Sequence, residues 1–304
     1  MMRDALKDDA WFDQWIGYDI ERLKKMMVIR ESPPGDKNYE PQYVFEIANK
    51  NLHLLLSRYS RGDAIGELSE YFVPLLDAWE EAERLGQAVW SPEIQITRHS
   101  WKVNLDHYID CFWLVGLALA LAIDDAQWQR LLALIDLGGN EGTDELLDRV
   151  IAAKQPGRRI GRGLCHPKPY QRLLEAVNAP KSQQSAMLRT FVEQWYRELD
   201  RLPKKGLARE TAMYERPYWY DYHKADGGYF GYWCVEAVAA VKAFGMDDAA
   251  CLGLPHYPGD LLRPSGPSIH PQPTAKTQAA AVAVITRPEG LGDKLRRWVF
   301  APKV

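Results

Sequence analysis

The sequence predicts an all-α fold in which two helical modules pack as one body. Apolar residues recur at the three-to-four-residue spacing of amphipathic helices through most of the chain. Residues that start and stop helices bound several of these segments. The pairs Asp124-Asp125 and Thr143-Asp144 stand where N-caps and first-turn acids belong, and Gly138-Gly139 and Gly245 stand where C-caps belong. Alternation typical of strands is rare, and only residues 93–97 hint at it.

Nine segments carry the helical pattern. They are residues 4–30, 42–59, 63–85, 104–122, 125–137, 142–153, 168–178, 182–201 and 227–244. Residues 31–41 contain three prolines and a glycine and are expected to form a loop. The longest apolar run is the 13 residues 111–123, whereas a membrane span needs about 20. We therefore expect the fourth segment to be a fully buried central helix.

Charge and composition suggest how the chain is organised. Residues 1–150 contain 27 acidic and 15 basic residues, whereas residues 151–304 contain 14 and 23. Such an asymmetry can mark a binding surface, or it can mean that the two halves attract each other. We expect an acidic N-terminal module at 1–138 and a C-terminal module at 139–262. A Pro-rich linker and tail at 263–304 complete the predicted organisation.

Two observations bear on the compartment. Asp4, Asp8 and Asp9 lie where a secretory signal would need a long apolar run, so no signal peptide is expected. The four cysteines, at positions 111, 165, 234 and 251, are not at metal-ligand spacing, which suits reduced thiols. We therefore expect a cytoplasmic protein that does not associate with membranes.

The sequence contains single residues that could be catalytic, but no set of residues that together match a known catalytic motif. Asp106 and Asp110 share a face at the start of the predicted buried helix, and His107 is turned about 100° away. A metal site there is conceivable, but a cluster that caps the helix and stays wet is favoured. Glu236 lies in an apolar segment, where pairing with an arginine or a tyrosine hydroxyl is favoured over a role as general acid. We predict no catalytic residue, metal or cofactor.

Residues 154–169 are rich in basic side chains and contain no acids. The basic residues are Lys154, Arg158, Arg159, Arg162 and Lys168. They could contact nucleic acid, or they could form a solvated loop that pairs with the acidic first half. The second interpretation is favoured, because no aromatic residues interleave with the charges. Direct binding of nucleic acid is therefore not expected.

Residues 63–85 predict a helix with one apolar and one acidic face. On a helical wheel, five acids fall within an arc of about 80°. They are Asp63, Glu67, Glu70, Asp77 and Glu81. Pro74 is expected to kink the helix midway. The acids could form an ordinary solvated face or a surface that binds a basic protein partner. We carry the second possibility forward as a hypothesis.

Sequence motifs in the C-terminal half of the chain resemble those of a known protein family. Residues 228–242 are GYFGYWCVEAVAAVK, followed by FGMDD at 244–248 and PHYPGDLL at 255–262. This arrangement resembles the C-terminal module of PoNi-type immunity proteins. The signature residues are Tyr229, Tyr232, Trp233, Glu236, Lys242, Pro255, Tyr257, Pro258 and Asp260. Residues 3–7 (RDALK) and 57–63 (SRYSRGD) resemble the N-terminal module of the same family.

The resemblance covers about residues 3–262. It implies an all-helical, non-enzymatic protein that binds and neutralises a cognate nuclease toxin, often one delivered by a type VI secretion system. It does not supply contact residues, and we expect the signature to mark the fold more than toxin recognition.

Two alternative functions remain open. A metal-dependent hydrolase using Asp106, His107 or Glu236 predicts a bound metal or a concave polar pocket around these groups. A nucleic-acid binder using residues 154–172 predicts salt-dependent DNA binding.

Overall fold

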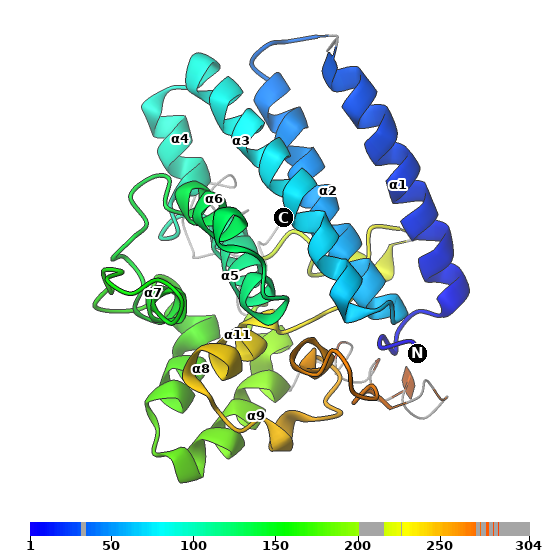
Figure 1. The fold of residues 1–304 in the computed structure, drawn as a ribbon, viewed down its shortest axis with the longest axis vertical. Helices are drawn as coiled ribbons and strands as arrows, with labels where there is room; N and C mark the ends of the chain where they lie inside the picture. Colours follow the sequence, from blue (N-terminus) through cyan, green and yellow to red (C-terminus); the bar gives the residue numbers. More distant parts are fainter. Residues whose placement is uncertain are drawn as a thin grey trace, which may run out of the picture.

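The computed structural model describes residues 1–31, 35–200, 216–225 and 227–271, together with 274, 278, 279, 282 and 285. These residues form ten α-helices and several short 3₁₀ helices, and they contain no β-strand (Figure 1). The predicted all-α class is therefore confirmed. No helix in these ranges is long and apolar enough to cross a membrane. The predicted tail from 272 onward lies almost entirely outside the described residues.

Three long helices form one side of the molecule. α1 (Asp9–Glu31), α2 (Glu40–Arg61) and α3 (Phe72–Val89) stand side by side, with α2 packed against both neighbours (Figure 1). Apolar residues of α2 such as Leu52 and Leu55 are buried. α2 ends at Gly62, whose φ of 103° is in the left-handed region that favours glycine.

The helix at the centre of the fold is α5 (Leu105–Ala120). All its residues except Asp106 and Ala120 are buried, which confirms the prediction of a buried central helix. α6 (Asp125–Ile135) follows, and the Asp124 carboxylate caps it by accepting a hydrogen bond from the Gln127 N–H. Asp144 caps α7 (Glu145–Ala152) in the same way, through the N–H groups of Leu146 and Leu147.

The remaining helices pack against α5 from the other side. α8 (Pro167–Asn178) and α9 (Lys181–Glu198) form a pair, and α11 (Val235–Phe244) lies between them and α5 (Figure 1). Gly116 permits the close approach of α5 and α11, because a Cβ there would lie 2.9 Å from the Ala239 Cβ. Three 3₁₀ helices, η3 (Tyr222–Lys224), η4 (Ala249–Cys251) and η5 (Gly259–Leu262), flank this group.

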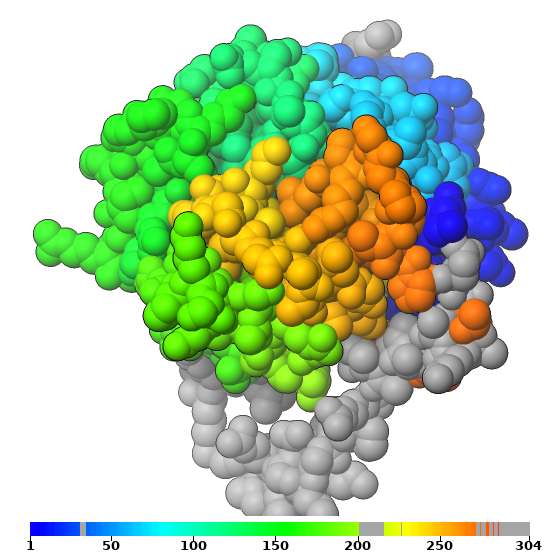
Figure 2. Space-filling model, turned by 60° about the horizontal axis from the view of Figure 1, so that its bottom comes forward, coloured from blue at the N-terminus to red at the C-terminus, as the bar shows by residue number. Residues whose placement is uncertain are grey.

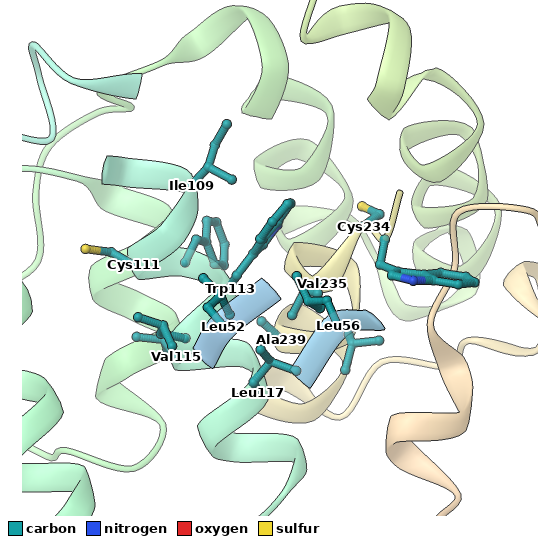
Figure 3. Close-up of a cluster of buried hydrophobic side chains, with 14 of the residues drawn as sticks. Leu52, Leu56, Ile109, Cys111, Trp113, Val115, Leu117, Cys234, Val235 and Ala239 are labelled. Atoms are coloured by element: carbon teal, nitrogen blue, oxygen red, sulfur yellow. The ribbon is translucent and has the colours of Figure 1, made fainter. Parts of the chain in front are cut away.

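One hydrophobic core runs through both predicted modules. Figure 3 shows Leu52 and Leu56 of α2 together with Trp113 and Leu117 of α5 and with Val235 and Ala239 of α11. Because side chains from both halves of the chain share this cluster, the modules pack as one body, as the sequence predicts. The module boundaries at 138 and 262 stay predictions.

Two local predictions were wrong. Residues 93–97 form part of helix α4 (Pro92–His99), which Ser91 caps and Pro92 begins, so the hint of a strand is not realised. Residues 63–85 are not one kinked helix: a 3₁₀ helix, η1 (Ile65–Tyr71), precedes α3. Pro74 is the third residue of α3, where its missing N–H costs no helical hydrogen bond.

The segments on either side of α11 also differ from expectation. Residues 227–234 were predicted as helix, but the helix begins only at Val235. Gly231 has a φ of 98°, and a Cβ there would lie 2.3 Å from the Ser60 Oγ, so the chain passes this point as a tight non-helical turn. The segment that begins at residue 263 was predicted as a Pro-rich linker and tail. His270 is nevertheless buried, with its Nε2 3.0 Å from the Tyr59 Oη.

Candidate functional site

A polar cleft of about 830 Å³ opens between the N-terminal helices and residues 218–228. Its volume falls within the range of about 300–1,000 Å³ that is typical of ligand sites. Side chains from α1, α2, α3, α4 and α5 line it. The charged lining residues are Asp19, Arg22, Glu46, Lys50, Glu83, Arg98, Asp106 and Asp110, and the larger aromatic ones are Trp15, Tyr18, Phe45, Tyr218 and Tyr222.

Two carboxylates of α5 lie at this cleft, one helical turn apart. Asp106 accepts a hydrogen bond from the Tyr218 N–H at 3.1 Å. Asp110 is only 8% exposed, and its Oδ1 has no hydrogen-bond partner among the described residues. Burial raises the pKa of Asp106 to about 7. Burial also raises the pKa of Asp110 well above its ordinary value, and the neighbouring charges of Asp106 and Glu46 raise it further. Burial therefore favours the protonated form of both carboxyls until a cation pairs with them.

The sequence interpretation of Asp106, His107 and Asp110 as a wet capping cluster was wrong. The cap of α5 is Asn104, whose side chain accepts a hydrogen bond from the His107 N–H. Asp110 is buried because the segment containing Tyr218 lies over this end of α5. A concave polar pocket does surround Asp106 and His107, which is one of the two features that a hydrolase predicts.

Three histidines line the cleft. His53 Nε2 lies 2.7 Å from the Tyr218 Oη, and His99 Nε2 lies 2.9 Å from Glu83 Oε1. Burial lowers the pKa of His53 and of His107 to about 3, so both rings are neutral near pH 7. Across the part of the chain that the structure describes, no three His, Cys, Asp or Glu side chains are grouped so that they could hold a metal ion.

Most of the basic side chains at the cleft are already engaged. Lys50 Nζ pairs with Asp19 Oδ1 at 2.9 Å. The Arg98 guanidinium stacks on the Trp90 ring at 3.7 Å from its centroid, while its Nη1 has no hydrogen-bond partner among the described residues. Arg22 is exposed on α1. Among the described residues, no ion pair joins a lysine or arginine to Asp106, Asp110 or Glu46.

The five acids of residues 63–81 lie elsewhere on the surface, and arginines neutralise them in part. Arg58 pairs with Asp63, with Glu67 at 3.1 Å and with Glu70 at 2.5 Å. Arg130 of α6 holds Asp77 at 2.5 Å, and Arg84 holds Glu81 at 2.6 Å. The prediction of one helical face with a single sign of charge was therefore wrong. Asp63, Glu67 and Glu70 also precede α3.

The basic segment pairs with acids of the first half of the chain, as favoured from the sequence. Arg158 is buried and binds Asp148 at 2.8 Å and Asp136 at 2.7 Å. Lys154 pairs with Asp125, and Arg159 pairs with Glu141. Because Arg158 holds two carboxylates inside the fold, this segment is not simply a solvated loop.

Glu236 is fully buried in the core. Its Oε1 accepts hydrogen bonds from the Tyr170 hydroxyl at 2.9 Å and from the Trp195 Nε1–H at 3.2 Å. Burial raises the pKa of Glu236. The structural interpretation, in which a tyrosine hydroxyl pairs with this carboxyl, is confirmed for Oε1, whereas Oε2 has no hydrogen-bond partner among the described residues.

The two sequence signatures meet in space. Arg3 Nε donates to Asp260 Oδ2 at 2.6 Å, and the Tyr229 hydroxyl donates to Asp4 Oδ2 at 2.6 Å. The Trp233 Nε1–H donates to the Ser60 Oγ at 2.7 Å. Figure 2 shows the C-terminal segment, in orange, beside the N-terminal residues, in blue. This joint between the modules could not be read from either signature alone.

The remaining signature residues have varied positions. The Tyr257 hydroxyl donates to Asp248 at 2.6 Å, and the Tyr232 hydroxyl donates to the Tyr220 carbonyl at 2.8 Å. Pro258 is buried, whereas Lys242 and Pro255 are exposed. Most of the signature therefore packs or ties the fold, and two of its members face solvent.

Comparison with known proteins gives two kinds of match. A family model described as "PoNe immunity protein (PoNi), N-terminal" matches residues 3–133, and one described as "PoNe immunity proteins (PoNi), C-terminal" matches residues 142–261. The crystal structure of protein PA2201 from Pseudomonas aeruginosa is similar in fold, with a TM-score of 0.61 and 20% identity over 86% of this chain and 91% of that chain. No curated protein matches the chain.

Proposed function

Because this chain belongs to the PoNi family of immunity proteins against PoNe nuclease toxins, we propose that it binds and neutralises one cognate nuclease. The observation that carries the proposal is the match of both family modules, in order, across residues 3–261. We further propose that the toxin is an antibacterial DNase delivered by a type VI secretion system. On this proposal the immunity protein meets its target in the cytoplasm, where the DNA lies.

The proposed mechanism is occupancy and not catalysis. A nuclease binds the phosphates of its substrate with lysine and arginine side chains, and an acidic protein surface can compete for them. The side chains of Glu67, Glu70 and Asp77 are 59%, 58% and 57% exposed, so they remain accessible to a basic partner. Asp63 and Glu81, at 10% and 33%, are suited to holding the neighbouring arginines in place.

The ratio of immunity protein to nuclease at full inhibition tests the proposed occupancy mechanism. With the cognate nuclease, DNA cleavage should fall in proportion to added protein and reach zero at a 1:1 ratio. Nanomolar binding corresponds to about 12 kcal/mol, and such interfaces bury about 1,200–2,000 Å², so surfaces beyond the acidic residues must contribute. Full protection at a ratio well below 1:1 would contradict occupancy and would favour the hydrolase, whose predicted polar pocket is present.

Charge reversal tests the acidic surface. The double substitution Glu67→Lys and Glu70→Lys should slow association with the nuclease about tenfold and weaken its salt dependence, because long-range attraction steers the encounter. Association rates measured at several salt concentrations provide the readout. The matched control is Glu175→Lys with Glu193→Lys, which reverses two exposed acids of α8 and α9. Equal rates for the two double variants would show that Glu67 and Glu70 form only a solvated surface.

A further inference from the structure

We propose that the cleft beside α5 is the pocket for a cationic side chain, an arginine or lysine, that the toxin inserts between Asp106, Asp110 and Glu46. This inference rests on the proposed function and adds to it a defined anchor point. The three acids of the pocket lie on α2 and α5, away from the acids at positions 63–81.

The first observation is the unsatisfied carboxyl of Asp110. Its side chain is more than nine-tenths buried, it lines the cleft, and its Oδ1 lacks a hydrogen-bond partner among the described residues. A buried polar atom without a partner is costly, because it has lost its water without a replacement. A donor that enters the cleft would supply the missing hydrogen bond.

The second observation is the sign of the local charge. Asp106 lies one turn before Asp110, and Glu46 of α2 lies near Asp110. Within the described residues no ion pair joins a lysine or arginine to these three acids: Lys50 is bound to Asp19, Arg98 is stacked on Trp90, and Arg22 is exposed on α1. The cleft is therefore complementary to a positive group that comes from outside.

The third observation is the aromatic lining. Trp15 and Tyr18 of α1 pack edge to face at 5.4 Å, and both line the cleft together with Tyr218 and Tyr222. Aromatic faces attract cations, and arginine more often than lysine. Arginine anchors in desolvated pockets also dominate many protein interfaces. A nuclease carries such side chains to bind its own substrate. The inserted cation is therefore assigned to the toxin.

A matched pair of small probes tests the cation preference without the toxin. L-arginine amide and L-citrulline amide have nearly the same shape and differ in the charge of the terminal group. Calorimetric titration of the full chain should show arginine amide binding at least tenfold more tightly than citrulline amide. Asp106→Asn combined with Asp110→Asn should remove that preference. Equal binding of the two amides to the wild-type chain would overturn the inference.

The same variants then test the role of the cleft in toxin binding. Asp106→Asn with Asp110→Asn should weaken toxin affinity at least tenfold, whereas the control Glu175→Gln with Glu193→Gln should not. Glu46→Gln on α2 provides a second probe if the double variant folds poorly by circular dichroism. If the wild-type chain forms no toxin complex, the proposed function fails. If the complex forms and neither cleft variant weakens it, the function stands and the cleft proposal fails.

Discussion

Replacing Arg3 by methionine should lower the free energy of unfolding by about 3–5 kcal/mol, because it leaves a buried carboxylate without its counter-ion. The side chains of Arg3 and Asp260 are 9% and 4% exposed. Arg3 Nη1 also donates to the carbonyl oxygens of Tyr59 and Asp63, both at 2.9 Å. Urea unfolding, with the midpoint and slope fitted separately, measures the change.

The matched control for Arg3→Met is Lys24→Met. Lys24 pairs with Glu21 at 2.7 Å on the exposed face of α1, where water screens the pair, so its loss should change the midpoint little. A double-mutant cycle with Asp260→Asn isolates the pair, because asparagine can still accept the hydrogen bond from the Ile269 N–H. Equal midpoints of urea unfolding for Arg3→Met and Lys24→Met would contradict a large contribution of the Arg3–Asp260 ion pair to stability.

Asp106→Asn should stabilise the protein at alkaline pH relative to the wild type. The pKa of Asp106 is raised from 3.8 to about 7, chiefly by burial. Below about pH 4 the group is protonated in both the folded and the unfolded states. Between about pH 4 and pH 7 only the unfolded state ionises, so wild-type stability falls as the pH rises. The difference between variant and wild type should therefore grow by roughly 4 kcal/mol from pH 4 to pH 8.

The comparison must be made between variant and wild type, because other groups at the cleft also titrate. His53 and His107 have lowered pKa values, so they contribute stability that is lost as the pH falls below about 6.5. Asp110 on α5 and Glu46 on α2 share the cleft with Asp106, together with Tyr218 and Tyr222. Chemical denaturation at each pH gives the difference. A constant difference from pH 4 to pH 8 would show that Asp106 ionises normally in the folded chain.

Much of the fold follows from local patterns. The apolar run 111–123 predicts a buried helix because no polar side chain interrupts it. Asp124 and Asp144 cap the N-termini of helices, and Gly245 caps a C-terminus, where the chemistry of each residue suits the position. The predictions of local structure fail where tertiary contacts determine the backbone conformation. Residues 227–234 carry a helical pattern, yet Gly231 must pass close to Ser60, which lies far away in the sequence.

The cleft was only half visible in the sequence. Asp106 and Asp110 stand out as a pair on one helical face, but local spacing suggests a wet helix end. Their burial depends on Tyr218, which lies 112 positions away and whose N–H binds Asp106. The neutralisation of the acids at positions 63–81 was hidden for the same reason, because Arg130 reaches Asp77 across 53 positions. Neither long-range contact leaves a periodic pattern in the sequence from which it could be predicted.

The shared core restricts how such a protein can diversify. Gly116 in one half must meet Ala239 in the other without a gap or a clash, and Ser60 must meet Trp233. A recombinant that joins the first half of one family member to the second half of a distant one would bring together surfaces that were never selected as a pair. On the proposal that the cleft binds the toxin, new partner specificity is reached more easily by single substitutions at the rim of the cleft than by exchange of whole modules.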